Sequence, residues 1–235
     1  MKNSNKLKVS AIIVAAGRGS RMNMDINKQY IEVAGKAVLA RTLQVFNDCD
    51  SIDEIIVVVN ENDIIFCKQN IVDFYEFSKV KTLVAGGDER QKSVYNGLKE
   101  VNEQCDIVLI HDGARPFISE ESIKNSIWAS VEFGGSVVAV PVKDTIKMAN
   151  TQGIITQTID RSTLWSVQTP QTFKYDLVMS AHKSAIKDGF IGTDDAVLLE
   201  RLGHQLKVVM GGYDNIKITT KEDLIVAEAT IKMRE

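Results

Sequence analysis

The sequence predicts an α/β fold with a doubly wound, mostly parallel sheet and a projecting β-arm. Several short apolar runs lack in-and-out alternation, and segments with helical periodicity lie between them. Strands that are covered on both faces of a parallel sheet have such runs, and this alternating order is typical of doubly wound folds. A length of 235 residues and a hydrophobic fraction of 44% suit one domain over residues 1–235.

The strands and the first helices are predicted from these patterns. Val9–Ala16 is the first strand, and it ends in glycines. Three more apolar runs predict strands at Ile55–Val59, Ile107–Ile110 and Val137–Val140. Apolar spacing predicts helices through Val38–Phe46 and Val94–Val101.

Helix start signals predict three further helices. Ser119, followed by two glutamates, marks one start, and Thr193–Ala196 marks another that Gly203 ends. Thr219 and Glu222 have capping-box spacing before an apolar segment, so we expect a final helix there.

The segment Lys143–Thr158 departs from the pattern. It is polar and β-prone and contains Asn150 and Gly153, so we expect an extended hairpin within an arm at about residues 141–163. Such an arm packs on something, and a second subunit is the simplest candidate. We therefore expect a homodimer.

Composition excludes several classes of protein. The net charge of −3 and the lack of a Lys/Arg-rich run argue against nucleic-acid binding. A short polar N-terminus and short apolar runs predict neither a signal peptide nor a membrane span. The three cysteines form no C-x-x-C pair, and an odd count without a secretory leader indicates reduced thiols and a cytoplasmic protein. The three histidines lack zinc-site spacing.

The first candidate site motif, Ala15–Met22, directly follows the first strand. Its glycines allow close approach to a ligand, and free N–H groups before a helix form an anion site. Arg21 and Lys28 add two cations, as a triphosphate requires. The alternative is a plain strand-to-helix turn.

The second motif, His111–Pro116, follows an apolar strand, where open α/β sheets bind ligands. Asp112 suits Mg²⁺, which takes one or two carboxylates plus phosphate oxygens. The alternative is a turn aspartate paired with an arginine, and we expect His111 to be structural.

Two weaker motifs complete the set. Gly86–Ser93 is a glycine turn that enters a helix and could line a base or ribose. In Asp214–Thr219, Lys217 lies within a short strand-like segment, where it either faces a cleft or is a solvated edge lysine.

In this order and spacing, the four motifs resemble those of the 2-C-methyl-D-erythritol 4-phosphate cytidylyltransferases of isoprenoid synthesis. The resemblance also includes Val140–Lys147 and Leu164–Gln171, and it extends from about Val9 to Ala229. It implies a single nucleotidyltransferase domain with a Rossmann-like fold, whose β-arm reaches into a homodimer partner. It also implies a Mg²⁺-dependent reaction that joins CTP to the polyol phosphate and releases pyrophosphate.

The resemblance implies a role for each matching position. CTP would contact Ala15, Ala16, Gly17, Gly19, Gly87, Asp88 and Ser93, and its phosphates would contact the catalytic residues Arg21, Lys28 and Lys217. The metal would lie at Asp112 and Asp214, with Asp112 also at the substrate. The polyol phosphate would contact Arg115 and Thr193, and, from the neighbouring subunit's arm region, Thr145, Arg161 and Thr169.

Three alternatives remain open. Ribitol 5-phosphate cytidylyltransferases share the first loop and Gln168–Gln171, but Gly113-Ala114 before Arg115 and the lysine that ends Asp144–Lys147 favour the erythritol enzymes. A nicotinamide-dependent oxidoreductase would need a third glycine where Met22 stands. A non-catalytic nucleotide-binding protein is disfavoured by the joint presence of the cations and Asp112.

Overall fold

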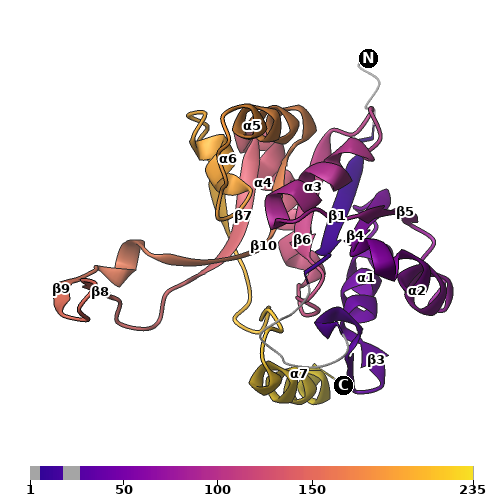
Figure 1. Cartoon of the computed structure of the whole chain (residues 1–235), viewed down its shortest axis with the longest axis horizontal. Coiled ribbons are helices and arrows are strands. Elements are labelled where there is room, and N and C mark those ends of the chain that lie inside the picture. The colour runs from indigo at the N-terminus through magenta and orange to yellow at the C-terminus, as the bar shows by residue number, and fades with distance from the viewer. Residues whose placement is uncertain (1–5, 18–26, 235) are drawn as a thin grey trace.

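The computed structural model describes residues 6–17 and 27–234, with the backbone alone at Lys28. Within these residues, seven strands form one sheet in the order β11-β7-β10-β6-β1-β4-β5 (Figure 1). They are β1 (Val9–Ala15), β4 (Glu54–Val59), β5 (Val80–Ala85), β6 (Ile107–Asp112), β7 (Gly135–Pro141), β10 (Trp165–Lys174) and β11 (Lys207–Met210). Only β10 runs antiparallel to its neighbours. The predicted doubly wound, mostly parallel sheet is therefore confirmed.

The strand order reverses beside β1. The chain passes from β1 to β4 on one side and later returns to β6 on the other side. Open α/β sheets bind ligands outside the carboxyl ends of the strands at such a reversal. The topology therefore places the candidate site between the ends of β1 and β6.

Helices cover both faces of the sheet. They are α1 (Val38–Asp48), α2 (Ile64–Cys67), α3 (Arg90–Lys99), α4 (Glu120–Phe133), α5 (Tyr175–Lys187) and α6 (Ala196–Glu200). The last helix, α7 (Lys221–Arg234), lies apart from the sheet and packs on a third, smaller core (Figure 1). A π-helical segment, Lys68–Asp73, follows α2, and a small ribbon of β2 (Glu32–Val33) and β3 (Lys36–Ala37) precedes α1.

Successive residues of the central strands pack into two separate cores. Ile13 and Leu109 face the core that α1 and α4 close, whereas Ile12 and Ile110 face the core that α3 and α5 close. All four side chains are fully buried. This explains the unbroken apolar runs of the sequence, because each strand has an apolar partner on both faces.

The predicted helix starts are confirmed, with one correction. Ser119 caps α4 by accepting the N–H of Ser122 at 3.1 Å. The capping box expected at Thr219 and Glu222 is wrong: the Asp223 carboxylate accepts the N–H groups of Thr219 and Thr220, at 2.7 and 2.8 Å. In a capping box, the carboxylate lies three residues after the N-cap residue. Because α7 begins at Lys221, its N-cap residue is Thr220, and the residue three positions later is Asp223 instead of Glu222.

The predicted hairpin is also confirmed. Strands β8 (Lys147–Ala149) and β9 (Ile155–Thr158) pair antiparallel and project well beyond the body of the molecule (Figure 1). The hairpin leaves the sheet after β7 and returns to β10 through a single turn of 3-10 helix, Arg161–Thr163. Its expected contact with a second subunit stays a prediction.

No helix in the part of the chain that the structure describes has the length and apolar composition needed to cross a bilayer.

Candidate active site

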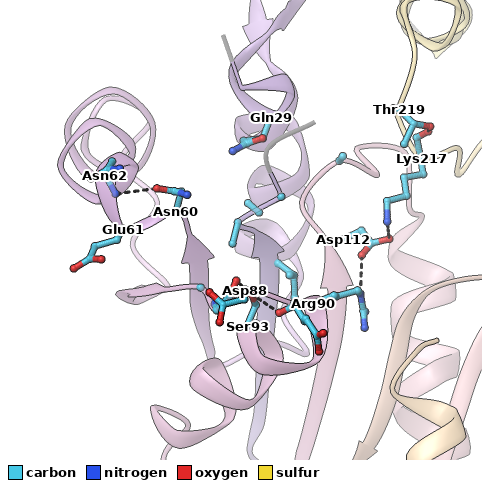
Figure 2. A pocket seen from close by; sticks show the side chains of 18 residues that line it. Gln29, Asn60, Glu61, Asn62, Asp88, Arg90, Ser93, Asp112, Lys217 and Thr219 are labelled. Carbon is cyan, nitrogen blue, oxygen red and sulfur yellow. Dashed lines mark hydrogen bonds and ion pairs between the residues drawn. The ribbon is translucent and has the colours of Figure 1, made fainter. Parts of the chain in front are cut away.

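A cavity of about 790 Å³ opens at the carboxyl ends of β1 and β6 (Figure 2). The described residues that line it come from five loops, from the start of α3 and from the ends of these strands. They are Val14–Gly17, Gln29, Asn60–Asn62, Gly86–Arg90, Ser93, Asp112, Ala114, Lys217 and Thr219. All four sequence motifs therefore contribute to one cavity.

The first motif borders this cavity through Ala15, Ala16 and Gly17. Gly19 and Arg21 lie outside the described residues, as does the side chain of Lys28, so their predicted roles stay predictions. The backbone of Lys28 begins a short 3-10 helix that ends at Tyr30.

The loop between β5 and α3 forms a second wall. The Ser93 hydroxyl accepts the N–H of Gly87 at 3.0 Å and donates to the carbonyl of Glu89 at 3.0 Å. This fixes the turn before α3 and leaves Asp88 exposed at the rim, where it pairs with Lys92. Gly87, Asp88 and Ser93 all line the cavity, as the sequence predicts.

We expect Gly86→Ala to disturb this wall. A Cβ atom at Gly86 would lie 2.3 Å from the Cβ of Ala16, so one of the two glycine loops has to move. The free energy of unfolding should fall by roughly 1–3 kcal/mol, the usual cost of overpacking, and KM for the nucleotide should rise. Thermal denaturation and steady-state kinetics measure these effects. Gly17→Ala is the control for stability, because its Cβ would meet no atom of the described residues within 4 Å. Equal melting temperatures for the two variants would contradict the steric argument.

Asp112 ends β6 and lies among three cations. Its Oδ2 is 2.8 Å from Lys217 Nζ and 3.5 Å from Arg115 Nε, and its Oδ1 is 3.5 Å from Arg90 Nε. Burial by itself raises the pKa of this carboxyl, but the three cations outweigh burial and hold the pKa well below its usual range. Asp112 is therefore ionised near neutral pH, and its low pKa makes it a poor general base.

A chain of hydrogen bonds fixes the end of β6. The Asp112 N–H donates to the Thr169 hydroxyl at 3.0 Å, and that hydroxyl lies 3.1 Å from His111 Nδ1. His111 Nε2 lies 3.0 Å from the carbonyl of Arg115, which can only accept. Nε2 therefore carries the proton, and Thr169 donates to Nδ1. Burial lowers the pKa of His111 to about 4, so it is a neutral structural residue, as expected.

Lys217 lies in an irregular segment, which corrects the strand expected there. The segment is fixed from both sides. Asn215 donates to the Gln168 side chain and to the carbonyl of Thr169, each at 3.0 Å, and Ile218 is completely buried in the core that α7 closes. Lys217 between them faces the cavity and reaches Asp112 (Figure 2), so the interpretation as a solvated edge lysine is wrong.

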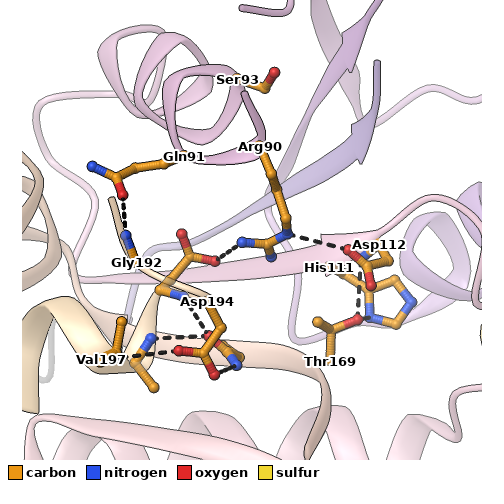
Figure 3. Close-up of polar contacts among 12 residues, drawn as sticks. Arg90, Gln91, Ser93, His111, Asp112, Thr169, Gly192, Asp194 and Val197 are labelled. Carbon is orange, nitrogen blue, oxygen red and sulfur yellow. Dashed lines mark hydrogen bonds and ion pairs between the residues drawn. The ribbon is translucent and has the colours of Figure 1, made fainter. Parts of the chain in front are cut away.

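Arg90 is a cavity residue to which the sequence analysis gave no role. Its Nη1 lies 2.7 Å from Asp195, and Figure 3 shows its other contact, to Asp112. Arg90 stood inside the third motif, but nothing in the sequence indicated that Asp112 and Asp195 would be its partners. Those two carboxylates are 83 positions apart in the chain.

The comparisons with known proteins match almost the whole chain. The profile of the 2-C-methyl-D-erythritol 4-phosphate cytidylyltransferase (IspD) family matches residues 9–233. The chain belongs to this family. A relative of that name from Alkaliphilus oremlandii is 52% identical over 98% of each chain, and one from Clostridioides difficile is 49% identical over 96% of this chain and 94% of the relative. The crystal structure of 4-diphosphocytidyl-2C-methyl-D-erythritol synthase from Anaerococcus prevotii superposes with a TM-score of 0.86, at 37% identity over 97% of each chain.

Family membership confirms the function that the sequence predicted. The chain is a nucleotidyltransferase, a 2-C-methyl-D-erythritol 4-phosphate cytidylyltransferase. The ribitol 5-phosphate alternative receives no support from these matches, nor do the oxidoreductase and the non-catalytic nucleotide-binding protein.

The cytidylyltransferase cavity does not contain every residue that the resemblance assigned to it. Thr169 lies in β10, in the centre of the sheet, and its buried hydroxyl forms hydrogen bonds with Asp112 and His111 of its own chain. This corrects its expected place in a neighbouring subunit's arm region. Asp214 is ion-paired with Arg234 and is not among the lining residues, so the structure does not bring it to Asp112 in the cavity.

The other predicted substrate contacts lie at three places. Arg115 is held beside Asp112 and donates to the carbonyl of Asn215 at 2.8 Å. Thr193 is exposed in the loop before α6. Thr145 and Arg161 belong to the arm, are exposed, and do not line this chain's cavity. Their roles as substrate contacts stay predictions.

Proposed function

We propose that the cavity between β1 and β6 binds CTP and 2-C-methyl-D-erythritol 4-phosphate together and is the place where they react. The observation that carries this proposal is the ionised Asp112 with its three cations, directly beside the glycine loop that ends β1. Two anionic substrates repel each other at close range, and fixed cations reduce this repulsion. The same cations are in place before the substrates arrive, so little reorganisation is needed.

The proposed reaction is an in-line phosphoryl-type transfer. An oxygen of the polyol phosphate forms a bond to the α-phosphorus of CTP, and the bond from that phosphorus to the β-phosphate oxygen breaks and releases pyrophosphate. The attacking phosphate is already ionised at neutral pH, so no general base is required. The protein contributes position and positive charge, which are the main factors in phosphoryl transfer.

The residues have separate tasks in this proposal. Lys217 contacts the α-phosphate, and the glycine turns with Ser93 hold the cytidine part. Asp112 accepts hydrogen bonds from hydroxyl groups of the polyol, since it is ionised and acceptor-only. Arg21 and Lys28 contact the triphosphate by resemblance to the family.

The cavity residues fit Mg²⁺ only if the substrate phosphates and water supply the rest of its ligands. Asp112 is one buried carboxylate, and the described residues contain no group of three or more His, Cys, Asp or Glu side chains that would hold a metal. Mg²⁺ usually takes one or two carboxylates together with substrate phosphates and water. Asp112 would therefore be its protein ligand in this cavity, and the ion would reduce the charge on the phosphates of CTP.

Pyrophosphate release tests the acceptor. The purified chain should release pyrophosphate from CTP with 2-C-methyl-D-erythritol 4-phosphate and much more slowly with ribitol 5-phosphate. Omission of each substrate in turn supplies the controls. Faster release with the ribitol substrate would contradict the assignment, and release that needs no acceptor would indicate hydrolysis of CTP instead.

We further propose that the arm dimerises the protein. An isolated two-stranded hairpin has little stability of its own, and here Met148 and Ile155 are 52% and 61% exposed. A second copy is a partner that would cover them, and it would bring Thr145 and Arg161 to the neighbouring cavity. A cytoplasmic location is proposed with it, supported by three buried cysteines that form no disulfide.

If the arm forms the dimer interface, changes to its exposed apolar residues should convert the dimer to a monomer. The wild-type chain should be a dimer by light scattering, and Met148→Asp with Ile155→Asp should make it a monomer. Ile225→Asp on α7 is the matched control, because Ile225 is also apolar and 71% exposed but lies outside the arm. A dimer that persists in the double variant would rule out the arm as the interface.

A further inference from the structure

Arg90 and Asp195 form an ion pair at the wall of the cavity. Arg90 Nη1 lies 2.7 Å from Asp195 Oδ2, whereas its Nε lies 3.5 Å from Asp112 Oδ1. The tighter partner of Arg90 is therefore Asp195, which is 1% exposed and does not line the cavity. The Arg90 side chain is itself partly exposed and does line it.

Asp195 is held in place from several elements. Gln171 of β10 accepts the N–H groups of Asp195 and Ala196, each at 3.0 Å, and donates to Asp194 at 2.8 Å. His182 of α5 lies 3.3 Å from the other carboxylate oxygen of Asp195. Burial opposes ionisation of Asp195, but Arg90 and His182 keep its pKa below the ordinary value. Asp195 is thus a fixed anion.

A second set of contacts, made by hydrogen bonds, connects the start of α3 with the segment before α6. Gln91, next to Arg90 at the start of α3, accepts the N–H of Gly192 at 2.8 Å (Figure 3). It also donates to the carbonyl of Phe190 at 3.0 Å. The first turn of α3 and the segment before α6 are therefore held together by these bonds and by the Arg90–Asp195 pair. This rigid support gives the guanidinium of Arg90 a defined position relative to Asp112.

The position of Arg90 matters because arginine and carboxylate prefer a close, bidentate pair. Without the buried anion behind it, Arg90 would close on Asp112 and compete with Lys217 and with any ligand hydroxyl. With Asp195 in place, the bonds that the described residues make to Arg90 use Nε and Nη1. The Nη2 group is left for a ligand.

The geometry also indicates which substrate is affected. Triphosphate oxygens only accept hydrogen bonds, so a bare carboxylate at Asp112 repels them. A carboxylate flanked by cations instead suits a ligand that carries both hydroxyl groups and a phosphate. Both substrates carry hydroxyl groups and phosphate, but the proposed function places the cytidine part of CTP at the glycine turns and Ser93, which leaves Asp112 and its cations to the polyol phosphate.

We propose that Asp195 is a positioning residue that acts through Arg90, and that this pair sets the affinity for the polyol phosphate. This inference rests on the proposed function of the cavity. Asp195 itself touches neither substrate.

The test is a double-mutant cycle in the full-length protein. Asp195→Asn should raise KM for 2-C-methyl-D-erythritol 4-phosphate on the order of 10-fold, while KM for CTP stays within about twofold, because one charge-assisted contact to one substrate is weakened. Arg90→Gln should have at least the same effect. The double variant should be no worse than Arg90→Gln alone, since Asp195 has nothing left to position.

Asp188→Asn is the matched control, because it removes an arginine–aspartate pair, with Arg201, that does not line the cavity. Its KM values should equal those of the wild type. If Asp195→Asn does not fold by thermal denaturation, Arg90→Lys carries the test: one ammonium cannot bridge both carboxylates, so KM for the polyol phosphate should again rise.

The outcomes separate the two proposals. Additive effects in the cycle, or an unchanged KM for the polyol phosphate in Asp195→Asn or Arg90→Lys, would overturn the positioning role while the wild-type enzyme stays active. Failure of the wild type to release pyrophosphate from CTP with the polyol phosphate would overturn the proposed function and this inference with it.

Discussion

Lys217→Ala should lower kcat on the order of 10²-fold or more. Lys217 Nζ lies 2.8 Å from Asp112 in the cavity, and its segment is fixed by Asn215 and Ile218, so its charge is preorganised. Loss of one preorganised stabiliser of transition-state charge usually costs 10²–10³-fold in rate. The free energy of activation would rise by about 2.7 kcal/mol for a 100-fold loss. Steady-state pyrophosphate release with both substrates varied measures the effect.

The controls distinguish a lost charge from a disturbed fold. Lys217→Arg keeps the charge but changes its reach, so it should recover only part of the rate. Lys221→Ala removes an exposed lysine at the start of α7 and should leave kcat unchanged. A Lys217→Ala enzyme with near-normal turnover would remove Lys217 from the mechanism.

His111 should make the protein less stable in mild acid. Its pKa is about 4 in the folded chain because burial disfavours the charged ring, against an ordinary value of 6.5. The unfolded chain therefore takes up a proton first as the pH falls. The contribution of His111 to stability is complete above pH 6.5 and decreases by about 1.4 kcal/mol for each pH unit down to about pH 4, roughly 3 kcal/mol in all.

Urea denaturation between pH 7 and 4 measures this loss. His111→Gln cannot titrate in that window, so its free energy of unfolding should depend less on pH, although it starts lower at pH 7 because the bonds to Thr169 and Arg115 are disturbed. The stabilisation that Asp112 contributes is lost only as the pH falls below its ordinary pKa of 3.8, because its own pKa is depressed, so this loss lies outside the window. An unchanged slope in His111→Gln would show that another group controls the window.

Local sequence signals predicted much of the fold. The strands found from sequence, such as β1 and β4, consist of apolar residues in every position of their centres because both faces are covered. Ser119 predicted the start of α4, since its cap needs only residues within one helical turn. The hairpin β8–β9 was predicted because a polar segment with Asn150 and Gly153 lacks the apolar residues of a buried sheet strand.

Strands β5, β10 and β11 were not predicted from the sequence, because the burial of their residues depends on neighbours that are far away in the chain. Strand β10 carries Gln168, Thr169 and Gln171, polar side chains that are buried only because Asn215, Asp112 and the segment before α6 bond to them. Nothing local predicts burial of such residues. Strands β5 and β11 lie at the two edges of the sheet and are largely half-buried or exposed, and their apolar runs are only three residues long.

By itself, the sequence determined the doubly wound sheet, the arm, the family, and the four motifs that line one cavity. Those features depend on periodicity, on turn residues and on motif order, all of which are written along the chain. Only the tertiary structure decided that Arg90 stands between Asp112 and Asp195, that Thr169 serves its own chain, and that Asp214 pairs with Arg234 instead of lining the cavity. The physical reason is that a charge or a hydroxyl chooses its partner by distance in space and by burial, and neither can be read from separation along the chain.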